Sequence, residues 1–258
     1  MFFYFGRVRH TVYGFEQAGG VRPDMAVLKN IFLVVAAVVA GVWLPGCCDG
    51  SRGQQTNAVP KGAINLFDGR DFSHWRHEDG TDVQWKIIDG VMEVGVGRGS
   101  IVTRQNFQDF TLHVEFNIPV KPAAEDKWGH GNSGVYLQRR YEVQILDSYG
   151  RAAGTKACGA LYDFRAPDRN VCKQAGQWQS YDIDFRAARF RQEDGNFRKV
   201  ENACITVRHN GELIHNDVEL MNKTGAGQAE GDQPGPILLQ DHGNAVRFRN
   251  IRIMPLKE

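Results

Sequence analysis

Most of the chain alternates apolar and polar residues with a period of two, and this pattern limits its fold more than any other sequence feature. From Ile64 onward, short alternating stretches are separated by clusters of Gly, Asn, Asp and Pro. A period of two is typical of β-strands, and no stretch shows the sustained 3.6-residue period of an amphipathic helix. The clearest expected strands cover residues 111–118, 133–138, 141–146, 180–185, 203–208, 237–240 and 245–253. Seven or more such strands predict an all-β sandwich of two antiparallel sheets.

The connections between these strands fall into two kinds. Asn210-Gly211 predicts a tight hairpin, because Asn-Gly supplies the positive φ angles of a type I′ turn. The charged residues 189–201 predict an extended, solvent-facing hairpin. Residues 148–179 and 221–236 are irregular, and loops of this length in a compact domain are usually functional or disordered.

The N-terminal region resembles an export signal. Lys29 precedes an apolar run over residues 31–44, which ends in Leu44-Pro45-Gly46-Cys47. The run is shorter than the roughly 20 residues that a membrane-spanning helix needs, so a signal peptide is favoured over a transmembrane helix. A small residue before cysteine is similar to the bacterial lipobox, with Cys47 as the lipidated residue. We therefore expect a lipoprotein of the bacterial cell envelope, anchored in the membrane on the periplasmic side or at the cell surface.

This interpretation divides the chain into three parts. Residues 1–46 form an N-terminal extension with the signal peptide, residues 47–62 form the lipidated cysteine and a flexible tether, and residues 63–258 form the β-sandwich domain. The formal net charge is only +1, and no cluster of Lys and Arg could neutralise a run of phosphates. Nucleic acid is therefore not an expected partner.

The cysteines predict structure rather than metal chemistry. None of the five has the paired CxxC spacing of a zinc site, and calcium stays an alternative for which no dense Asp/Asn string supplies a ligand motif. We expect no cofactor. Cys158 and Cys172 flank a loop in a protein bound for an oxidising compartment, so we predict a disulfide between them. Cys204 lies on an alternating strand and is expected to be a buried free thiol.

One expected strand combines an apolar face with a polar one. In residues 141–146, Tyr141, Val143 and Ile145 should enter the core, while Glu142 and Gln144 face away from it. The same parity places His113, Glu115, Asn117, Tyr136 and Gln138 on outward faces. Such an open polar face can bind sugar hydroxyls and stack on sugar rings, although ordinary solvated polarity of a sheet explains the pattern as well.

Two further segments add candidate residues. Gln240 and His242 should share one side if their strand persists, and a histidine with a pKa near neutrality is an obvious acid or base. The alternative for His242 is a structural histidine in a turn. Trp128 lies in an expected loop beside His130 and is the best candidate for a sugar-stacking platform.

Several motifs occur in an order that resembles a known family. They are Leu66-Phe67-Asp68-Gly69 with Trp75, residues 85–92 (WKIIDGVM), residues 110–116, Gly131-Asn132-Ser133-Gly134-Val135, residues 141–147 (YEVQILD), Gly159-Ala160-Leu161-Tyr162, residues 178–181, and residues 236–243 with 248–253. This set is similar to the bacterial 3-keto-disaccharide hydrolase domain. The resemblance implies a concanavalin A-like jelly-roll sandwich that carries its site on a concave sheet and acts on glycosides already oxidised to a ketone at C3.

The implied chemistry needs a base, an electrophile and an acid. A C3 ketone acidifies the C2 proton, and removal of that proton lets the C1 substituent leave before water adds. We expect Glu142 to be the base and His242 to be the acid or electrophile. The expected orienting, oxyanion or other substrate-binding residues are Asn132, Gln138, Gln144, Gln240, Glu115 and Trp128.

Two other functions fit parts of the pattern. A glucanase-type hydrolase needs a nucleophile and an acid on one strand, as in E-x-D-x-E, but Gln144 and Leu146 occupy two of those positions here. A non-catalytic carbohydrate-binding module is also compatible with the tether, the polar face and the tryptophans. In every case the expected partners are a sugar and, through the anchor, a membrane.

Overall fold

The computed structural model describes residues 61–120 and 129–256, and all regular structure within these ranges is β-strand. The strands are β1 (Ile64–Phe67), β2 (Trp75–His77), β3 (Lys86–Ile88), β4 (Val91–Glu93), β5 (Ile101–Thr103), β6 (Phe110–Asn117), β7 (Ser133–Leu137), β8 (Tyr141–Ile145), β9 (Trp178–Arg186), β10 (Arg189–Glu193), β11 (Asn196–Glu201), β12 (Ala203–His209), β13 (Glu212–Leu220), β14 (Leu238–Leu239) and β15 (Arg247–Pro255). The seven strands expected from the alternation are all present. Strands β1 to β5 have only three or four residues each, too few to show a repeated period.

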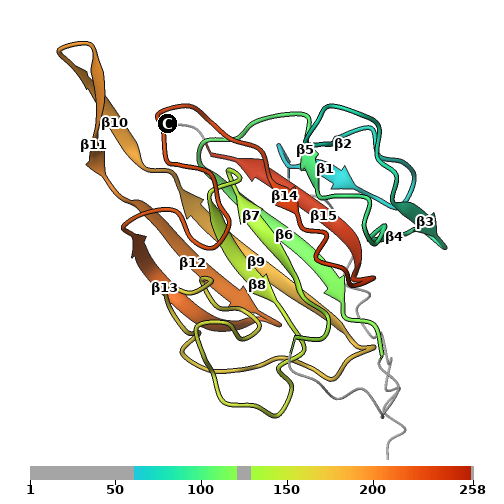
Figure 1. Cartoon of the computed structure of the whole chain (residues 1–258). Coiled ribbons are helices and arrows are strands. Elements are labelled where there is room, and N and C mark those ends of the chain that lie inside the picture. The colour runs from blue at the N-terminus through green and yellow to red at the C-terminus, as the bar shows by residue number, and fades with distance from the viewer. Residues whose placement is uncertain (1–60, 121–128, 257–258) are drawn as a thin grey trace, which may run out of the picture. The chain divides into compact units, whose positions relative to one another are not determined.

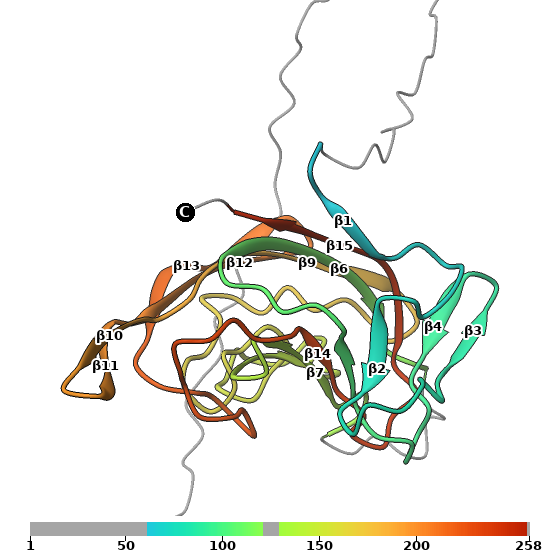
Figure 2. The same cartoon turned by 90° about the horizontal axis from the view of Figure 1, so that it is seen from above.

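The strands form a sandwich of two sheets (Figures 1 and 2). The larger sheet has the order β13-β12-β9-β6-β15-β4-β3, with β1 paired to β15, and the smaller sheet has the order β2-β5-β14-β7-β8. Neighbouring strands in both sheets are antiparallel. Figure 2 shows the larger sheet arching over the smaller one. The predicted all-β jelly-roll sandwich is confirmed.

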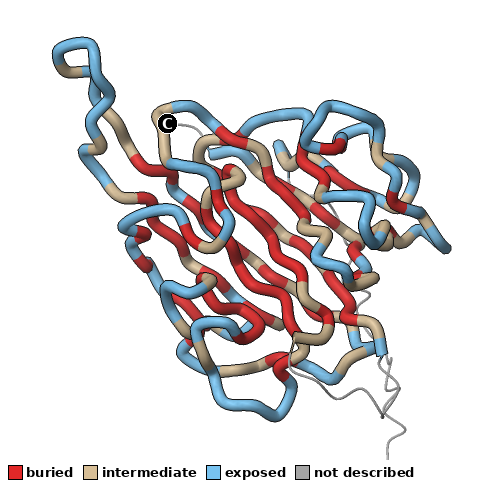
Figure 3. Tube along the Cα trace, in the orientation of Figure 1, coloured by how far each residue is buried: buried red, intermediate tan, exposed pale blue. Residues whose placement is uncertain are grey.

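The core fills the space between the sheets, and Figure 3 shows it as the buried centre of the strands. On β6, Leu112, Val114 and Phe116 are buried in this core, as their alternation predicts. The Phe116 ring packs against Tyr181 of β9 with 4.8 Å between centroids. The fully buried Trp75 donates its indole N–H to the Leu66 carbonyl over 2.7 Å, so its one polar atom is satisfied.

The free edge of β8 is covered by part of the long loop that follows it. The Gln144 N–H donates to the Ala160 carbonyl over 2.9 Å, and the Gly159 N–H donates to the Gln144 carbonyl over 2.9 Å. The Tyr162 N–H donates to the Glu142 carbonyl over 3.2 Å. These bonds pair the backbone groups at the edge of β8 and attach the loop to it. They therefore place Tyr162 close to the outward side chains of β8.

The turn between β7 and β8 has an unusual backbone. Gln138 and Arg139 both have positive φ angles, of 51° and 61°. The Gln138 amide donates to the Phe107 carbonyl over 2.9 Å and accepts a bond from the Arg140 guanidinium over 2.8 Å. These bonds anchor the turn and so fix how β7 and β8 pair.

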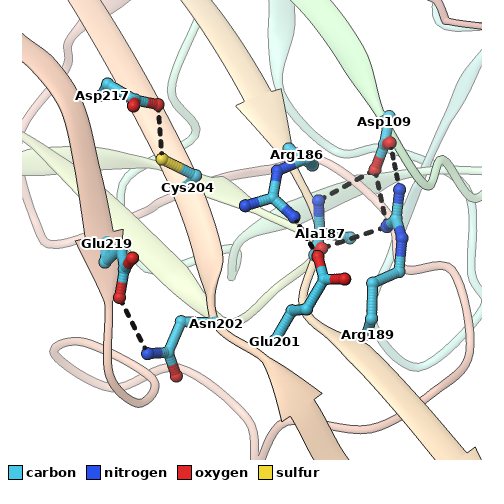
Figure 4. A network of polar contacts seen from close by, with 9 residues as sticks. All are labelled: Asp109, Arg186, Ala187, Arg189, Glu201, Asn202, Cys204, Asp217 and Glu219. Atoms are coloured by element: carbon cyan, nitrogen blue, oxygen red, sulfur yellow. Dashed lines mark hydrogen bonds and ion pairs between the residues drawn. The ribbon is translucent and has the colours of Figure 1, made fainter.

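Both predicted hairpins are present. Asn210 and Gly211 have φ angles of 54° and 83° and join β12 to β13. The β10–β11 hairpin projects beyond the sandwich in Figure 1. Figure 4 shows its base, where the Asp109 carboxylate accepts bonds from the Ala187 N–H at 2.9 Å and from the Arg189 guanidinium. This contact connects the base of the projecting hairpin to the residue that directly precedes β6.

Cys204 lies on β12 and is a buried free thiol, as predicted. Its Sγ donates to an oxygen of Asp217 on β13 over 2.8 Å (Figure 4). Within the described ranges, no helix is long and apolar enough to cross a membrane. The expected signal segment with Cys47, and the loop residue Trp128, lie outside the described residues.

Candidate active site

The outward face of the smaller sheet carries the central candidate residues. On β8, Tyr141, Val143 and Ile145 belong to the core, while Glu142 and Gln144 point to the opposite face, as alternation predicts. The expectation that this face is open is wrong for these two side chains. Glu142 is 3% exposed and Gln144 is 2% exposed, and Gly225 of the loop over residues 221–236 lies against the Glu142 carboxylate.

Three rows of residues cross this face, from β14 and its continuation through β7 to β8. The rows are Leu238, Tyr136 and Glu142; Gln240, Gly134 and Gln144; and His242 and Asn132. Gly134 therefore occupies the centre of the middle row and contributes no side chain. The Glu142 carboxylate leans over this vacant position from the neighbouring row.

Two glycines enclose the Glu142 carboxylate. A Cβ at Gly134 would lie 2.6 Å from Oε1, and a Cβ at Gly225 would overlap Oε2. The neighbouring Thr224 accepts a bond from the Glu142 N–H at its Oγ1 over 2.7 Å. The loop over residues 221–236 is thus seated on this carboxylate, and glycine is required wherever backbone approaches so closely.

Burial raises the pKa of Glu142 to about 7, and a hydrogen bond from the Tyr136 hydroxyl partly opposes this rise. Tyr136 lies directly opposite Glu142 on β7. A carboxylate with a pKa near neutral pH can both accept and release a proton under physiological conditions. It is therefore suited to general base catalysis.

A chain of hydrogen bonds through side-chain amides connects β8 to His242. The Gln144 Nε2 donates to Asn132 Oδ1 over 3.1 Å, which leaves Asn132 Nδ2 to face His242 Nδ1 at 3.2 Å. Because an amide nitrogen can only donate, Nδ1 must be the acceptor, and the neutral imidazole carries its proton on Nε2. His242 therefore presents an N–H donor to its exposed side.

Two buried amide oxygens on this face have no partner. Oε1 of Gln144 and Oε1 of Gln240 are both buried without a hydrogen bond from the described residues. The Gln240 Nε2 donates to the Tyr136 hydroxyl over 3.2 Å. Buried acceptors without donors are rare in folded proteins, and sugar hydroxyls could supply the missing bonds.

Comparison with known proteins identifies the family. Residues 62–254 match the model of the 3-keto-alpha-glucoside-1,2-lyase-like domain. The chain belongs to this family. A crystal structure of a protein from Parabacteroides distasonis ATCC 8503, proposed to be a glycosyl hydrolase, is 37% identical with a TM-score of 0.68, covering 76% of this chain and 84% of that one.

Two more distant proteins are also similar to this chain. The 3-keto-disaccharide hydrolase of Bacteroides thetaiotaomicron VPI-5482 is 24% identical over 232 residues, which cover 76% of this chain and 79% of the relative. A second P. distasonis structure, 23% identical with a TM-score of 0.57, covers 76% of this chain and 95% of that one and shares the fold. The resemblance read from the sequence motifs is confirmed.

Two residues expected at the site of this 3-keto-alpha-glucoside-1,2-lyase-like domain lie elsewhere. Glu115 is on β6, where it faces outward from the larger sheet and accepts a bond from Arg249 over 2.6 Å. Its neighbour His113 shares that face and pairs with Asp182 at 2.6 Å. Gln138 uses its amide to anchor the turn after β7. Glu115 and Gln138 therefore lie outside the three rows around Glu142, because outward polarity does not tell one sheet from the other and alternation ends at the turn.

The lyase-like domain also contains residues at the site that the sequence analysis did not select. Gly134 and Gly225 enclose the carboxylate, Thr224 seats the loop, and Tyr162 lies beside them, 3.2 Å from a Cβ built on Gly225. Strand alternation already placed Tyr136 on this face. The loop residues had no periodic signal that could have revealed them.

The predicted disulfide is not formed in the structure. Cys158 and Cys172 are both free and buried, and their thiol groups are in hydrogen-bond contact. The pairing thus stays a prediction for the oxidised protein. Within residues 61–120 and 129–256, no three or more His, Cys, Asp and Glu side chains form a group that could hold a metal ion.

Proposed function

We propose that this domain cleaves glycosides that have been oxidised to a ketone at C3. The observation that carries the proposal is the buried Glu142 carboxylate, whose pKa burial raises to about 7, on a face lined by amide groups. Family membership and the B. thetaiotaomicron relative, named a 3-keto-disaccharide hydrolase, support the substrate class.

The proposed reaction begins at C2 of the sugar. Glu142 accepts the C2 proton, which the neighbouring ketone has acidified, and the electron pair moves onto the ketone oxygen to give an enolate. The enolate then collapses, the bond from C1 to the leaving oxygen breaks, and that oxygen takes up the proton that Glu142 accepted, which restores the carboxylate. Water adds a hydroxyl to C1 and a proton to C2, so one water is consumed for each bond cleaved.

The remaining polar groups would hold the substrate and stabilise the enolate. His242 presents its Nε2–H as an electrophile for the developing oxyanion, and Asn132 fixes the orientation of that imidazole. The free Oε1 atoms of Gln144 and Gln240 accept bonds from sugar hydroxyls. Because Gly225 covers Glu142 Oε2, the loop over residues 221–236 must move before the substrate can contact the carboxylate.

Two alternative functions make different demands on the site. Direct glycoside hydrolysis needs a pair of carboxylates about 5 to 9.5 Å apart. The outward positions of β7 and β8 hold a single carboxylate, that of Glu142. A carbohydrate-binding module needs no base, so a buried carboxylate that titrates near neutral pH would have no purpose there. Burying such a group costs stability, and this cost favours a catalytic role.

The substrate class is tested by assaying purified protein with a 3-keto disaccharide and with its unoxidised parent. We expect turnover of the oxidised sugar only, because the parent C2 proton is not acidic. Turnover of the unoxidised sugar would indicate direct hydrolysis. Retention on glycan without any turnover of the 3-keto sugar would indicate a binding module.

Replacing His242 with alanine should lower turnover about tenfold. The enolate loses one hydrogen-bond donor, and water can replace only part of that bond at this exposed position. An electrophile acts on the enolate before the leaving group departs. We therefore expect equal losses on aryl and alkyl 3-keto glycosides, measured as kcat/KM. A much larger loss on the alkyl substrate would show that His242 instead protonates the leaving oxygen.

We further propose that the domain is displayed from the envelope as a lipoprotein anchored at Cys47. The Leu44-Pro45-Gly46-Cys47 motif motivates this location. Cys47→Ala should abolish labelling of the protein with a radioactive fatty acid and prevent signal cleavage at this site. Unchanged labelling of the variant would contradict the anchor.

A further inference from the structure

Tyr136 is a polar neighbour of the proposed base, yet the reaction described above assigns it no step. It lies directly across from Glu142 in the pairing of β7 with β8, and only 1% of its surface is exposed. The Tyr136 hydroxyl and the Glu142 carboxylate act on each other, since the hydroxyl lowers the pKa of Glu142 and the carboxylate raises the pKa of Tyr136. A buried tyrosine in this position cannot itself contact a substrate while the loop over residues 221–236 is seated.

The surroundings of Tyr136 fix the direction of its hydroxyl. The ring belongs to a small apolar cluster on the outer face of the sheet, with Leu238 as its neighbour on β14 and Val102 beyond Leu238 on β5. The phenolic oxygen accepts a bond from Gln240 Nε2 at 3.2 Å, and the Arg139 guanidinium lies 5.9 Å from the ring centroid. With its oxygen already occupied as an acceptor, the hydroxyl has its single proton free for the carboxylate.

We propose that Tyr136 is a positioning residue that keeps Glu142 usable as a base, by donating a hydrogen bond from a hydroxyl held in place by Gln240. The inference rests on the proposed role of Glu142. It adds a device by which a carboxylate can be buried without losing its charge at neutral pH. Gln240 then has two tasks, since its Nε2 orients Tyr136 while its Oε1 stays free for substrate.

Among the described residues around Glu142, no other element brings a cation that lowers the pKa of its carboxyl group. Tyr162 from the loop after β8, and Thr224 and Gly225 from the loop over residues 221–236, are all uncharged. Arg139 is engaged with Glu78 over 2.5 Å. Burial raises the pKa of Glu142, and among the described residues the Tyr136 hydroxyl is the group that lowers it.

The test is Tyr136→Phe, studied across pH. A hydrogen bond to the charged form of an acid favours that form, so its removal should raise the pKa of Glu142 further. Turnover at pH 7 should fall about fivefold or more, because a smaller fraction of Glu142 is ionised. It should return to within about twofold of the wild type near pH 9, where the carboxylate is ionised in both proteins.

Direct titration separates this inference from the proposed function. The Glu142 carboxyl carbon is followed by NMR in protein labelled with ¹³C at glutamate, with Glu142→Gln to identify its signal. A higher midpoint in Tyr136→Phe supports the inference, and an unchanged midpoint overturns it, whether or not the protein turns over a 3-keto sugar. A loss of activity that persists at pH 9 also overturns it, since Tyr136 would then act on the substrate itself.

A matched control keeps the hydroxyl and alters the apolar cluster to which the ring belongs. Val102→Ala truncates the member of this cluster that lies beyond Leu238 and leaves the bonds of Tyr136 to Glu142 and Gln240 possible. We expect the pH profile of this variant to follow that of the wild type. A profile shifted as far as that of Tyr136→Phe would assign the effect to packing and overturn the role of the hydroxyl.

Discussion

Replacing Glu142 with glutamine is expected to lower turnover of a 3-keto glycoside by at least about 100-fold, while substrate binding persists. Glutamine has nearly the same shape, so it fits between Gly134 and Gly225, but an amide cannot accept the C2 proton. Steady-state kinetics together with calorimetric binding to the inactive variant measure both effects. Turnover at the wild-type level would exclude Glu142 as the base.

The same variant should be more stable than the wild type in alkaline solution. Burial raises the pKa of Glu142 from its ordinary value of 4.5 to about 7, so the folded protein holds a proton that the unfolded chain releases at lower pH. The stability linked to this proton is complete below about pH 4.5 and is lost as the pH rises through 7. At pH 8 we expect Glu142→Gln to unfold with a free energy about 3 kcal/mol higher than the wild type, and with a free energy within about 1 kcal/mol of it at pH 5. Urea titrations at both pH values measure the difference, and a gain that does not depend on pH would contradict the assigned cause.

Adding one methyl group at Gly134 should lower turnover about 100-fold with little effect on the fold. In Gly134→Ala the new Cβ would lie 2.6 Å from Glu142 Oε1 and 3.1 Å from its Cγ. The carboxylate is the mobile end of its side chain, so it moves aside rather than disrupting the sheet. A displacement of about 1 Å at a reacting group can cost this much in rate.

The control for this substitution is Gly154→Ala, because Gly154 has an ordinary φ angle and no atom within 4 Å of a new Cβ. The free energy of unfolding of both variants should lie within about 1 kcal/mol of the wild-type value, as measured by urea titration. Only Gly134→Ala should lose turnover. Activity within about twofold of the wild type in Gly134→Ala would show that the carboxylate position is not critical.

Local alternation predicted correctly which way the side chains of β8 face. A strand determines which side of the sheet each of its residues faces, so the outward direction of Glu142 and Gln144 could be read from residues 141–146 alone. The turn residues Asn210 and Gly211 predicted their hairpin for the same reason, because the φ angles they favour are a local property.

The errors arose where the answer depends on contacts distant in sequence. Glu115 alternates as well as Glu142 does, but β6 joins the larger sheet, and its outward face lies on the other side of the sandwich. Burial of Glu142 depends on Gly225, which is far along the chain in a loop without periodicity. Its pKa near neutrality follows from that burial, so the sequence pattern could not predict it.

Gln138 illustrates how closely the site and the interior are linked. Along β7 and β8, residues of the site alternate with apolar residues of the core. The anchored turn at Gln138 sets the register in which the two strands pair. Lengthening or shortening this turn by one residue would send Glu142 into the hydrophobic interior and expel Val143. Changes in chain length can therefore accumulate in surface loops such as the tip of the β10–β11 hairpin. Between β7 and β8 a single inserted codon would remove activity and stability together.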